Sequence, residues 1–386
     1  MKRKISPGPI ILLISVVLLT YGCCKKDDIL GKTKFIFGAD LSYVNQILEH
    51  GGVYRDRGSI RDPYRIFKDH GANLVRLRLW HTPAWTKEVY GSAGTKTYND
   101  LADVKVAIRR SKEADLAVNL DFHYSDTWAD PQKQGIPAAW LGLDFKTLTD
   151  SVYQYTYRTL KTLNDEGLMP EMVQIGNEIN PGMLLPFGSI AASGWQPLGD
   201  LINSGIKAVR EVSELSDIKP LIILHVAQPE NVKFWFNNIA LLGGVTDFDI
   251  LGFSYYSKWS DVPIGKISSY VADLKKTFKK EVMIVETAYP WTGDNADSYA
   301  NIFDGGDEEP GYPVTPEGQL KYMTDLTQAI KDGGGMGIMV WEPAWISSDA
   351  KDLWGNGSAW DNCTFFDFEG NVNKGIGFMN YPYKKQ

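Results

Sequence analysis

The feature that most constrains the fold is a series of eight short apolar segments spread evenly along the chain. Each segment is rich in aliphatic residues and is followed by polar or aromatic residues. Their starts lie about 43 residues apart on average, enough for one helix between consecutive segments. The eight segments are Phe35–Gly38, Leu74–Leu79, Leu116–Phe122, Met172–Ile175, Leu221–Leu224, Ile250–Phe253, Val282–Val285 and Gly337–Trp341.

Helical patterns lie between these segments. Apolar residues recur mostly at three- and four-residue spacing over 148–163, and Thr315-Pro316 is typical of a helix start before residues 320–330. Strands that alternate with helices indicate parallel pairing, and eight such units predict a single (β/α)₈ TIM barrel, an α/β fold with long loops after strands seven and eight. A doubly wound sheet is the alternative, but no Gly-x-Gly-x-x-Gly motif follows the first segment.

Composition excludes several classes of protein. The chain is 44% hydrophobic and 23% charged, which is typical of a packed globular protein. Its net charge of −7 disfavours a surface that binds nucleic acid. Five histidines without a Cys/His cluster give no zinc motif. No change of composition divides residues 35–386, so we predict one catalytic domain there, acting as a monomer.

The first residues are typical of an export signal. A basic start precedes an apolar run over residues 10–19, and the run ends in Gly22-Cys23. Residues 1–24 therefore resemble a lipoprotein signal peptide and lipobox, with Cys23 as the lipidated residue. The following Lys25-Lys26-Asp27-Asp28, within a short tether over 25–34, resembles the export tag of Bacteroidetes surface lipoproteins. We expect a cell-surface lipoprotein of the outer membrane; a plain signal peptide would give a secreted or periplasmic protein.

Two glutamates follow apolar strands at matching positions. Strand four ends in Asn177-Glu178, and strand seven ends in Glu286 after four apolar residues. Carboxyl ends of barrel strands converge at one mouth, so the two carboxylates would face each other there. Two carboxyls about 5 Å apart perform retaining glycoside hydrolysis, in which one attacks the sugar and the other protonates the leaving oxygen. Structural ion pairs with arginine are the alternative.

Other residues near the two glutamates fit the same chemistry. Arg76 and Arg78 share one face of strand two, where an arginine would keep the nucleophile ionised. Asn177 can bind a sugar 2-hydroxyl, Tyr256 can hold an oxygen of the nucleophile, and Trp341 can form the floor of the reacting site. Each could instead be ordinary core packing.

The strand-end segments resemble glycoside hydrolase family 53, the endo-β-1,4-galactanases, over essentially all of residues 35–380. The most specific match is Asp121–Pro131, with the sequence DFHYSDTWADP. The other matching segments are Gly38–Val44, Val75–Trp80, Gln174–Asn180, Ser254–Tyr256, Val285–Trp291 and Trp341–Trp345.

This resemblance implies a TIM barrel with Glu178 as the acid/base, Glu286 as the nucleophile and β-1,4-galactan of pectin side chains as the substrate. It also implies substrate contacts by Asp40, Arg76, Arg78 and His123. Tryptophans that follow strand ends are expected to form stacking platforms for sugar rings, with at least one of the four packing within a loop instead. These tryptophans are Trp80, Trp128, Trp291 and Trp345.

No cofactor is required by this reading, although some relatives bind calcium between the loops after strands seven and eight. Here those loops span residues 290–313 and 346–371, and they carry enough oxygen ligands for a structural calcium ion. Solvated acidic loops are the alternative, and the metal ligands remain open. The acidic and amide residues are Asp294, Asn295, Asp297, Asp304, Asp307, Asp349 and Asp352. Cys363 has no partner for a disulfide in this region.

Three other functions stay open at this point. A different retaining endo-glycanase of the same clan would cleave xylan, mannan or β-glucan, and only the strand-three segment argues against it. A non-catalytic surface glycan-binding lipoprotein would account for the aromatic content but not for two converging carboxylates. An inverting hydrolase would need a wider carboxyl separation.

Overall fold

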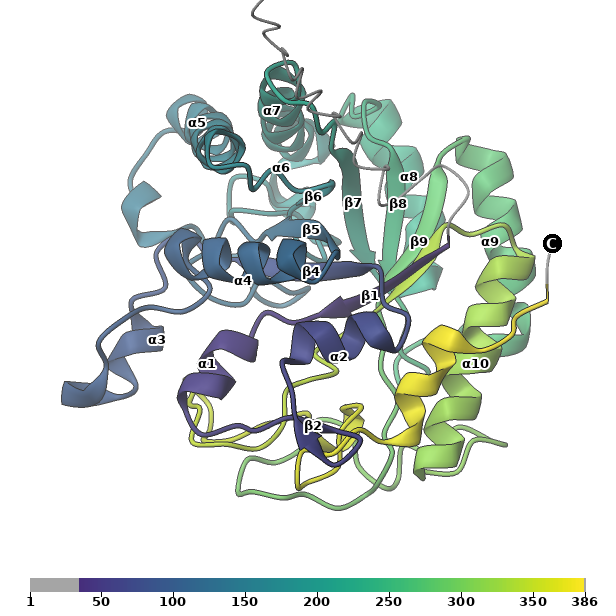
Figure 1. Cartoon of the computed structure of the whole chain (residues 1–386). Coiled ribbons are helices and arrows are strands. Elements are labelled where there is room, and N and C mark those ends of the chain that lie inside the picture. Colours follow the sequence, from purple (N-terminus) through teal and green to yellow (C-terminus); the bar gives the residue numbers. More distant parts are fainter. Residues whose placement is uncertain (1–34, 385–386) are drawn as a thin grey trace, which may run out of the picture.

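A computed structural model describes residues 35–384, in which eight parallel strands close into a barrel (Figure 1). The strand β1 pairs with both β10 and β4, which completes the ring. This confirms the predicted fold. The barrel strands are β1 (Ile36–Asp40), β4 (Leu74–Leu79), β5 (Ala117–Phe122), β6 (Met172–Ile175), β7 (Leu221–Ala227), β8 (Ile250–Ser254), β9 (Glu281–Glu286) and β10 (Gly337–Val340). The signal peptide and tether predicted over residues 1–34 lie outside the described residues.

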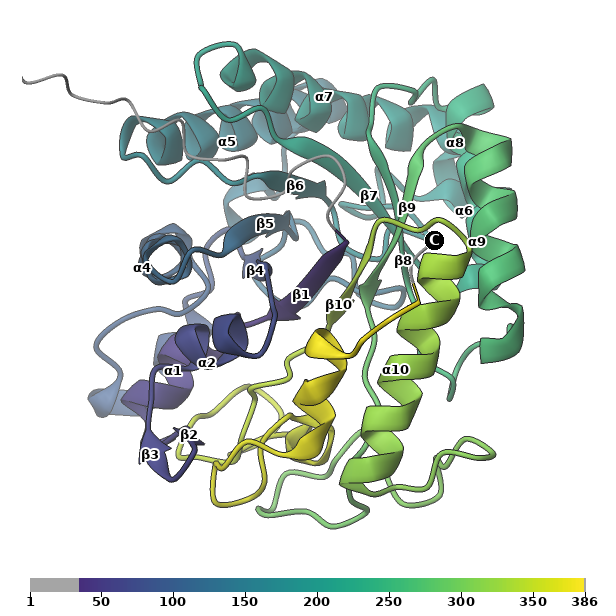
Figure 2. The ribbon, with the colours of Figure 1, turned by 45° about the vertical axis from the view of Figure 1, so that its right-hand side comes forward.

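Helices surround the barrel, and their packing follows their order along the chain. The two long helices α5 and α7 pack against each other, and α10 packs against α9 and a C-terminal 3-10 helix at Lys374–Asn380 (Figure 2). The helices are α1 (Val44–Glu49), α2 (Pro63–Asp69), α3 (Trp85–Glu88), α4 (Leu101–Glu113), α5 (Phe145–Asp165), α6 (Ile190–Ser193), α7 (Trp195–Ser213), α8 (Pro229–Leu242), α9 (Ile264–Phe278) and α10 (Pro316–Asp332).

The start of α10 shows how the sequence sets an element boundary. The side chain of Thr315 accepts a hydrogen bond from the Gly318 amide, and Pro316 occupies the first turn, where its missing amide proton costs nothing. The predicted start is therefore confirmed. Among residues 35–384, no helix is both long and apolar enough to cross a bilayer.

The lower half of the barrel interior is an apolar floor to which all eight strands contribute. Its members are all fully buried and fill the space inside the ring. They are Ile36, Leu74, Ala117, Met172, Ile223, Ile250, Met283, Val285 and Met339. Because side chains alternate along a strand, the next inward positions lie two residues further, toward the carboxyl ends.

On four of the strands these next inward positions are polar. Arg76 follows Leu74, Asn119 and then Asp121 follow Ala117, Gln174 follows Met172, and His225 follows Ile223. All five are buried. A buried polar side chain is costly without partners, so this layer must form a connected network. That network lies directly below the barrel mouth.

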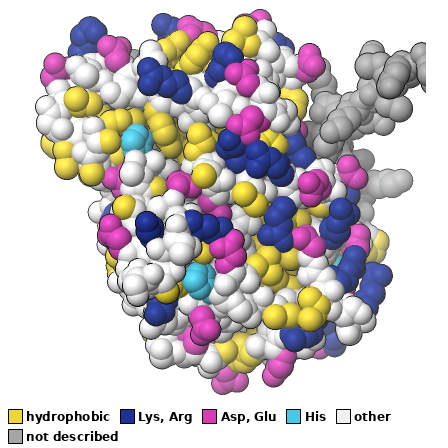
Figure 3. All heavy atoms as spheres, turned by 60° about the vertical axis from the view of Figure 1, so that its left-hand side comes forward, with side chains coloured by type: hydrophobic (Ala, Val, Ile, Leu, Met, Phe, Trp, Pro, Cys, Tyr) yellow, Lys and Arg dark blue, Asp and Glu magenta, His cyan; other side chains and the backbone are white. Residues whose placement is uncertain are grey.

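Long loops cover the mouth, as the sequence predicts. Residues 287–315 connect β9 to α10, and residues 341–373 lie between β10 and the C-terminal 3-10 helix. A small hairpin of β2 (Arg55–Asp56) and β3 (Ser59–Ile60), which the sequence did not indicate, lies between α1 and α2. On the face shown in Figure 3, basic and acidic side chains are interspersed.

Candidate active site

Glu178 reaches the barrel mouth because the chain turns sharply after β6. Gly176 has a φ of +77°, and Glu178 itself has a φ of +45°, a left-handed conformation that non-glycine residues rarely adopt. A Cβ at position 176 would come within 2.7 Å of the Ile179 side chain, so only glycine fits this turn. The strained backbone therefore points the Glu178 side chain into the mouth.

Glu286 ends β9 and is anchored by two donors. The Arg76 guanidinium lies 2.7 Å from one of its carboxylate oxygens, and the Tyr256 hydroxyl donates a 3.2 Å hydrogen bond to the other. Both contacts are those expected from the sequence. Glu286 is 5% exposed and Arg76 is fully buried, so this ion pair is shielded from water.

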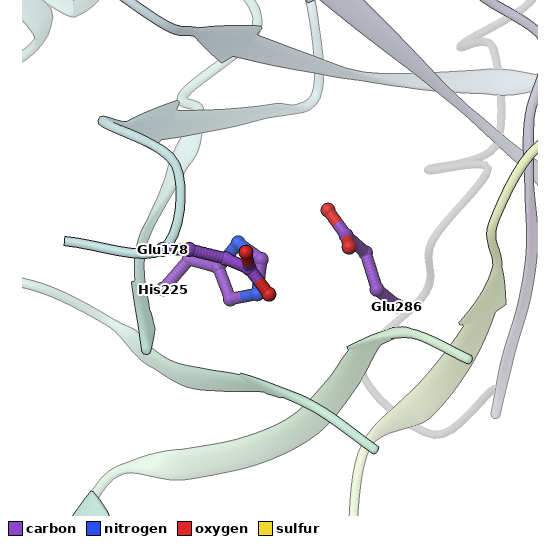
Figure 4. A group of neighbouring side chains, drawn as sticks. All are labelled: Glu178, His225 and Glu286. Atoms are coloured by element: carbon purple, nitrogen blue, oxygen red, sulfur yellow. The ribbon is translucent and has the colours of Figure 1, made fainter. Parts of the chain in front are cut away.

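The two carboxylates face each other across the mouth (Figure 4). One oxygen of Glu178, one oxygen of Glu286 and a ring nitrogen of His225 all lie within 4.8 Å of one another. A retaining pair is about 5–5.5 Å apart, whereas an inverting pair needs about 6.5–9.5 Å to hold a water molecule. The geometry therefore favours double displacement and disfavours the inverting alternative.

The two carboxylates have different surroundings, which favour different protonation states. Burial raises the pKa of the Glu178 carboxyl to about 7. Burial also raises the pKa of Glu286, to about 8, although the Arg76 guanidinium opposes that rise. The arginine and the Tyr256 hydroxyl stabilise an ionised Glu286, while a single hydroxyl, that of Ser254, contacts Glu178. On the strength of these contacts, we place the proton shared by the pair on Glu178.

The two glutamates lie in a groove of about 630 Å³ whose walls are largely aromatic. Aromatic rings can stack on the flat faces of sugars. An uncharged polysaccharide has no charged groups for the protein to bind, so stacking is a main source of affinity. Of the expected residues, Trp128, Asn177, Tyr256, Trp341 and Trp345 line this groove. Four further aromatic residues of the groove could not be predicted from the sequence, because they lie in loops well beyond strand ends: Trp259, Tyr299, Trp354 and Trp360.

Four residues expected to bind substrate lie below the groove instead. Asp40, Arg76, Arg78 and His123 are at most 2% exposed, and none of them lines the groove. Burial places these four side chains beneath the groove surface, and their contact with substrate stays a prediction. Their polar groups bind one another: Arg76 contacts Asp40 at 3.0 Å, and both Arg76 and His123 contact the Asp121 carboxylate.

Arg78 also differs from the expectation that it lies beside the nucleophile. Its guanidinium pairs with the buried Glu342 at 3.1 Å, not with Glu286. The same group lies 4.0 Å from the ring centroid of Trp128 and 5.7 Å from that of Trp341, within cation–π range of both. Arg78 therefore supports two rings of the groove from below.

Two expected platforms do not face the groove. Trp80 is fully buried and packs against Trp85 and Trp128, which makes it a core residue. The Trp291 indole donates to the backbone carbonyl of Asp361 at 3.2 Å, and its ring lies against Phe368. Position directly after a strand thus does not determine which way a ring faces.

Two acidic residues of the long loops have side-chain partners of their own. Asp307 pairs with Lys258 at 2.7 Å, and Asp352 accepts from the Tyr299 hydroxyl at 2.9 Å. Within the part of the chain that the structure describes, the one group of three acidic or histidine ligands close enough for a metal lies at the barrel mouth, around the two glutamates.

A parallel barrel with two facing carboxylates at a retaining separation, set in an aromatic groove, defines a glycoside hydrolase. Similarity to known proteins supports this assignment to the glycoside hydrolases. The model of glycosyl hydrolase family 53 matches residues 36–379. The chain belongs to this family.

Several relatives match most of the chain. An arabinogalactan endo-beta-1,4-galactanase of Cellvibrio japonicus is 43% identical over 95% of this chain and 93% of its own. An endo-beta-1,4-galactanase of Bacillus subtilis is 33% identical over 90% of this chain and 86% of its own. Among solved structures, the GH53 catalytic domain of Ignisphaera aggregans has a TM-score of 0.81 at 35% identity, covering 91% of this chain and 96% of that domain.

Proposed function

We propose that this protein is an endo-acting β-1,4-galactanase that cleaves galactan with retention of configuration. The observation that carries this proposal is the pair of carboxylates within 4.8 Å of each other in an aromatic groove. Family membership and the galactanases of Cellvibrio japonicus and Bacillus subtilis, each similar over most of its length, support the substrate class.

The geometry assigns different roles to the two carboxylates. Glu286, kept ionised by Arg76 and Tyr256, attacks the anomeric carbon and forms a covalent glycosyl-enzyme. Glu178 donates its proton to the leaving oxygen, then accepts a proton from the water that hydrolyses the intermediate. Asn177 lines the groove beside Glu178, where its side chain can reach a sugar 2-hydroxyl.

Substrate preference is tested with purified polysaccharides. We expect rapid release of oligosaccharides from linear β-1,4-galactan and little release from xylan, mannan, β-glucan or polygalacturonate. The net charge of −7 disfavours a polyuronide, and a neutral chain needs only hydroxyl hydrogen bonds and ring stacking. Strong activity on xylan or mannan with none on galactan would refute the proposal.

The two roles are tested by leaving-group dependence. Glu178→Ala should retain turnover of an activated aryl galactobioside but lose turnover of galactan, because only the poor leaving group needs a proton. Glu286→Ala should lose both activities, because no covalent intermediate forms. Equal and modest losses from both changes would instead indicate structural ion pairs.

We also propose that the enzyme is anchored at the outer membrane through a lipid on Cys23 and faces the cell exterior as a monomer. The support is the sequence of residues 1–28. Cells expressing the full chain should incorporate a labelled fatty acid into it, and Cys23→Ser should abolish the label. Protease added to whole cells should degrade an exposed enzyme and spare a periplasmic one.

A structural calcium ion between the two long loops is a further part of this proposal. Ser347 Oγ lies 2.6 Å from an oxygen of Asp297 and 2.7 Å from an oxygen of Asp361. Because a hydroxyl has only one proton, Ser347 can donate a hydrogen bond to only one of these two carboxylates. Neither carboxylate pairs with a Lys or Arg within the described residues. Oxygen ligands of this kind suit calcium, which would tie the loops together.

Chelation tests the calcium ion. EDTA should lower the melting temperature, added Ca²⁺ should restore it, and Asp361→Asn should make melting insensitive to both. The exposed Asp349 of the same region provides a control, since Asp349→Asn should leave the EDTA effect intact. A melting temperature of the unmodified enzyme that EDTA does not change would refute the proposal.

A further inference from the structure

A chain of buried polar side chains runs from Glu178 into the barrel interior. Ser254 Oγ lies 2.6 Å from Glu178 Oε1 and 2.8 Å from His225 Nε2. The other ring nitrogen of His225, Nδ1, lies 2.8 Å from Asn177 Oδ1. Ser254 is 1% exposed and His225 is fully buried, and neither lines the groove. Figure 4 shows the His225 ring and the Glu178 side chain together, opposite Glu286.

The direction of these hydrogen bonds follows from the partners of Asn177. Its Oδ1 lies 2.7 Å from Arg76 Nη2, and a guanidinium can only donate. Its Nδ2 donates to the backbone carbonyl of Ala129 at 2.8 Å. The amide orientation is therefore fixed, with Oδ1 as an acceptor. Nδ1 of His225 must then carry the hydrogen of the contact with Asn177.

The second ring nitrogen of His225 is consequently an acceptor. Burial lowers the pKa of His225 well below its usual value, so the ring is neutral and Nε2 keeps its lone pair. Gln174 Nε2 is 3.2 Å from Nδ1, but it has a shorter contact of 2.8 Å with the Asp121 carboxylate. Ser254 has one hydroxyl proton, and donation of that proton to Glu178 would lower the pKa of the carboxyl. Among the described residues, however, Nε2 of His225 has no other donor than Ser254, and a buried acceptor without a donor is costly. We therefore assign the proton to the contact between Ser254 and His225.

We propose that Ser254 and His225 are positioning residues that hold the catalytic proton on Glu178. Since the Ser254 proton points to His225, its oxygen presents only lone pairs to Glu178, and these accept a hydrogen bond from the protonated carboxyl. When Glu178 gives up its proton, the hydroxyl must turn toward the carboxylate, and His225 Nε2 loses its donor. The chain therefore favours the acid form by one hydrogen bond.

This inference rests on the role of Glu178 proposed above. Other charged and titratable groups also act on Glu178, and all of them stay in place when Ser254 is changed. They are Arg76 on β4, Asp121 on β5, Asp130 in the following loop, His225 on β7, Tyr256 after β8 and Glu286 on β9. A change at Ser254 therefore isolates the contribution of the hydrogen-bond chain.

The sign of a pH shift tests the proposal. Ser254→Ala removes the acceptor for the Glu178 proton, so the alkaline limb of kcat/KM on galactan should move to lower pH by about half to one unit. His225→Ala should move it the same way, because the freed Ser254 hydroxyl can then donate to the carboxylate. Ser254→Thr keeps the hydroxyl and should keep the limb. Ser213→Ala, a buried serine at the end of α7, should change nothing.

An unchanged limb, or one that moves to higher pH in Ser254→Ala, overturns the proposal, since a serine that donates to the carboxylate would produce the upward shift. The Glu178→Gln variant, measured on an activated aryl galactobioside, separates the two claims. If that variant keeps the alkaline limb of the unmodified enzyme, the limb does not report Glu178 and the acid/base role fails. If it loses the limb while Ser254→Ala leaves it in place, only the hydrogen-bond chain fails.

Discussion

Replacement of Arg76 by methionine should impair both stability and catalysis, and the structure indicates by how much. The guanidinium is fully buried and lies within 3.0 Å of three carboxylates, those of Asp40, Asp121 and Glu286. Removal of one partner from a buried ion pair typically costs about 3–5 kcal/mol, because the remaining charge stays buried without compensation. In a domain of this size that corresponds to a melting temperature lower by roughly 4–7 °C.

The effect on catalysis has a definite sign. Arg76 favours the ionised form of Glu286, so its removal raises the pKa of the nucleophile. The acid limb of kcat/KM should then move to higher pH, by about one unit for each 1.4 kcal/mol of lost charge stabilisation. At a pH one unit below the new limb, the rate should fall about tenfold.

Arg78→Met is a matched control for this experiment. Arg78 is equally buried but pairs with Glu342 and does not contact Glu286. Differential scanning calorimetry should show both variants destabilised, whereas pH profiles on galactan should show the acid limb displaced only in Arg76→Met. Equal displacement in both variants, or none in Arg76→Met, would refute the assignment of Arg76 as the counter-ion of the nucleophile.

Further expectations concern the groove and its pH dependence. Trp354 lines the groove and is 48% exposed, so Trp354→Ala should raise KM for long galactan about 5- to 150-fold with little change in melting temperature. Trp80→Ala should lower the melting temperature by several degrees with little change in KM, because Trp80 is fully buried. A kinetic effect without destabilisation would contradict this expectation. The unmodified enzyme should lose activity as the pH rises through about 7, where Glu178 loses its proton; constant kcat/KM up to pH 9 would contradict it.

The barrel could be predicted from the sequence because its strands are buried on both faces and read as apolar runs. The two glutamates could be found for the same reason, since each interrupts or follows such a run at the end that faces the mouth. Strand boundaries were accurate to within a few residues: β1 ends at Asp40, two residues beyond its expected end. The start of α10 carried its own capping signal at Thr315.

Residues below and beyond the strand ends could not be placed in the same way. The sequence shows on which face of a strand a buried polar side chain such as that of Arg78 lies. It does not show which residue on another strand this side chain contacts. His225 interrupts an apolar strand, which was a usable signal, but its role depends on Ser254 from the next strand. Trp354 contributes to the groove through the path of a long loop, which no periodicity encodes.

Chemical rescue with azide tests most directly whether Glu178 and Glu286 act as acid/base and nucleophile. Azide replaces the missing carboxylate on one face of the sugar, so its stereochemistry reports which face each glutamate serves. The account predicts that Glu178→Ala with azide yields a β-galactosyl azide, with retention, and that Glu286→Ala yields the α-azide, with inversion. The reverse assignment of products, or rescue of both variants with the same configuration, would contradict it.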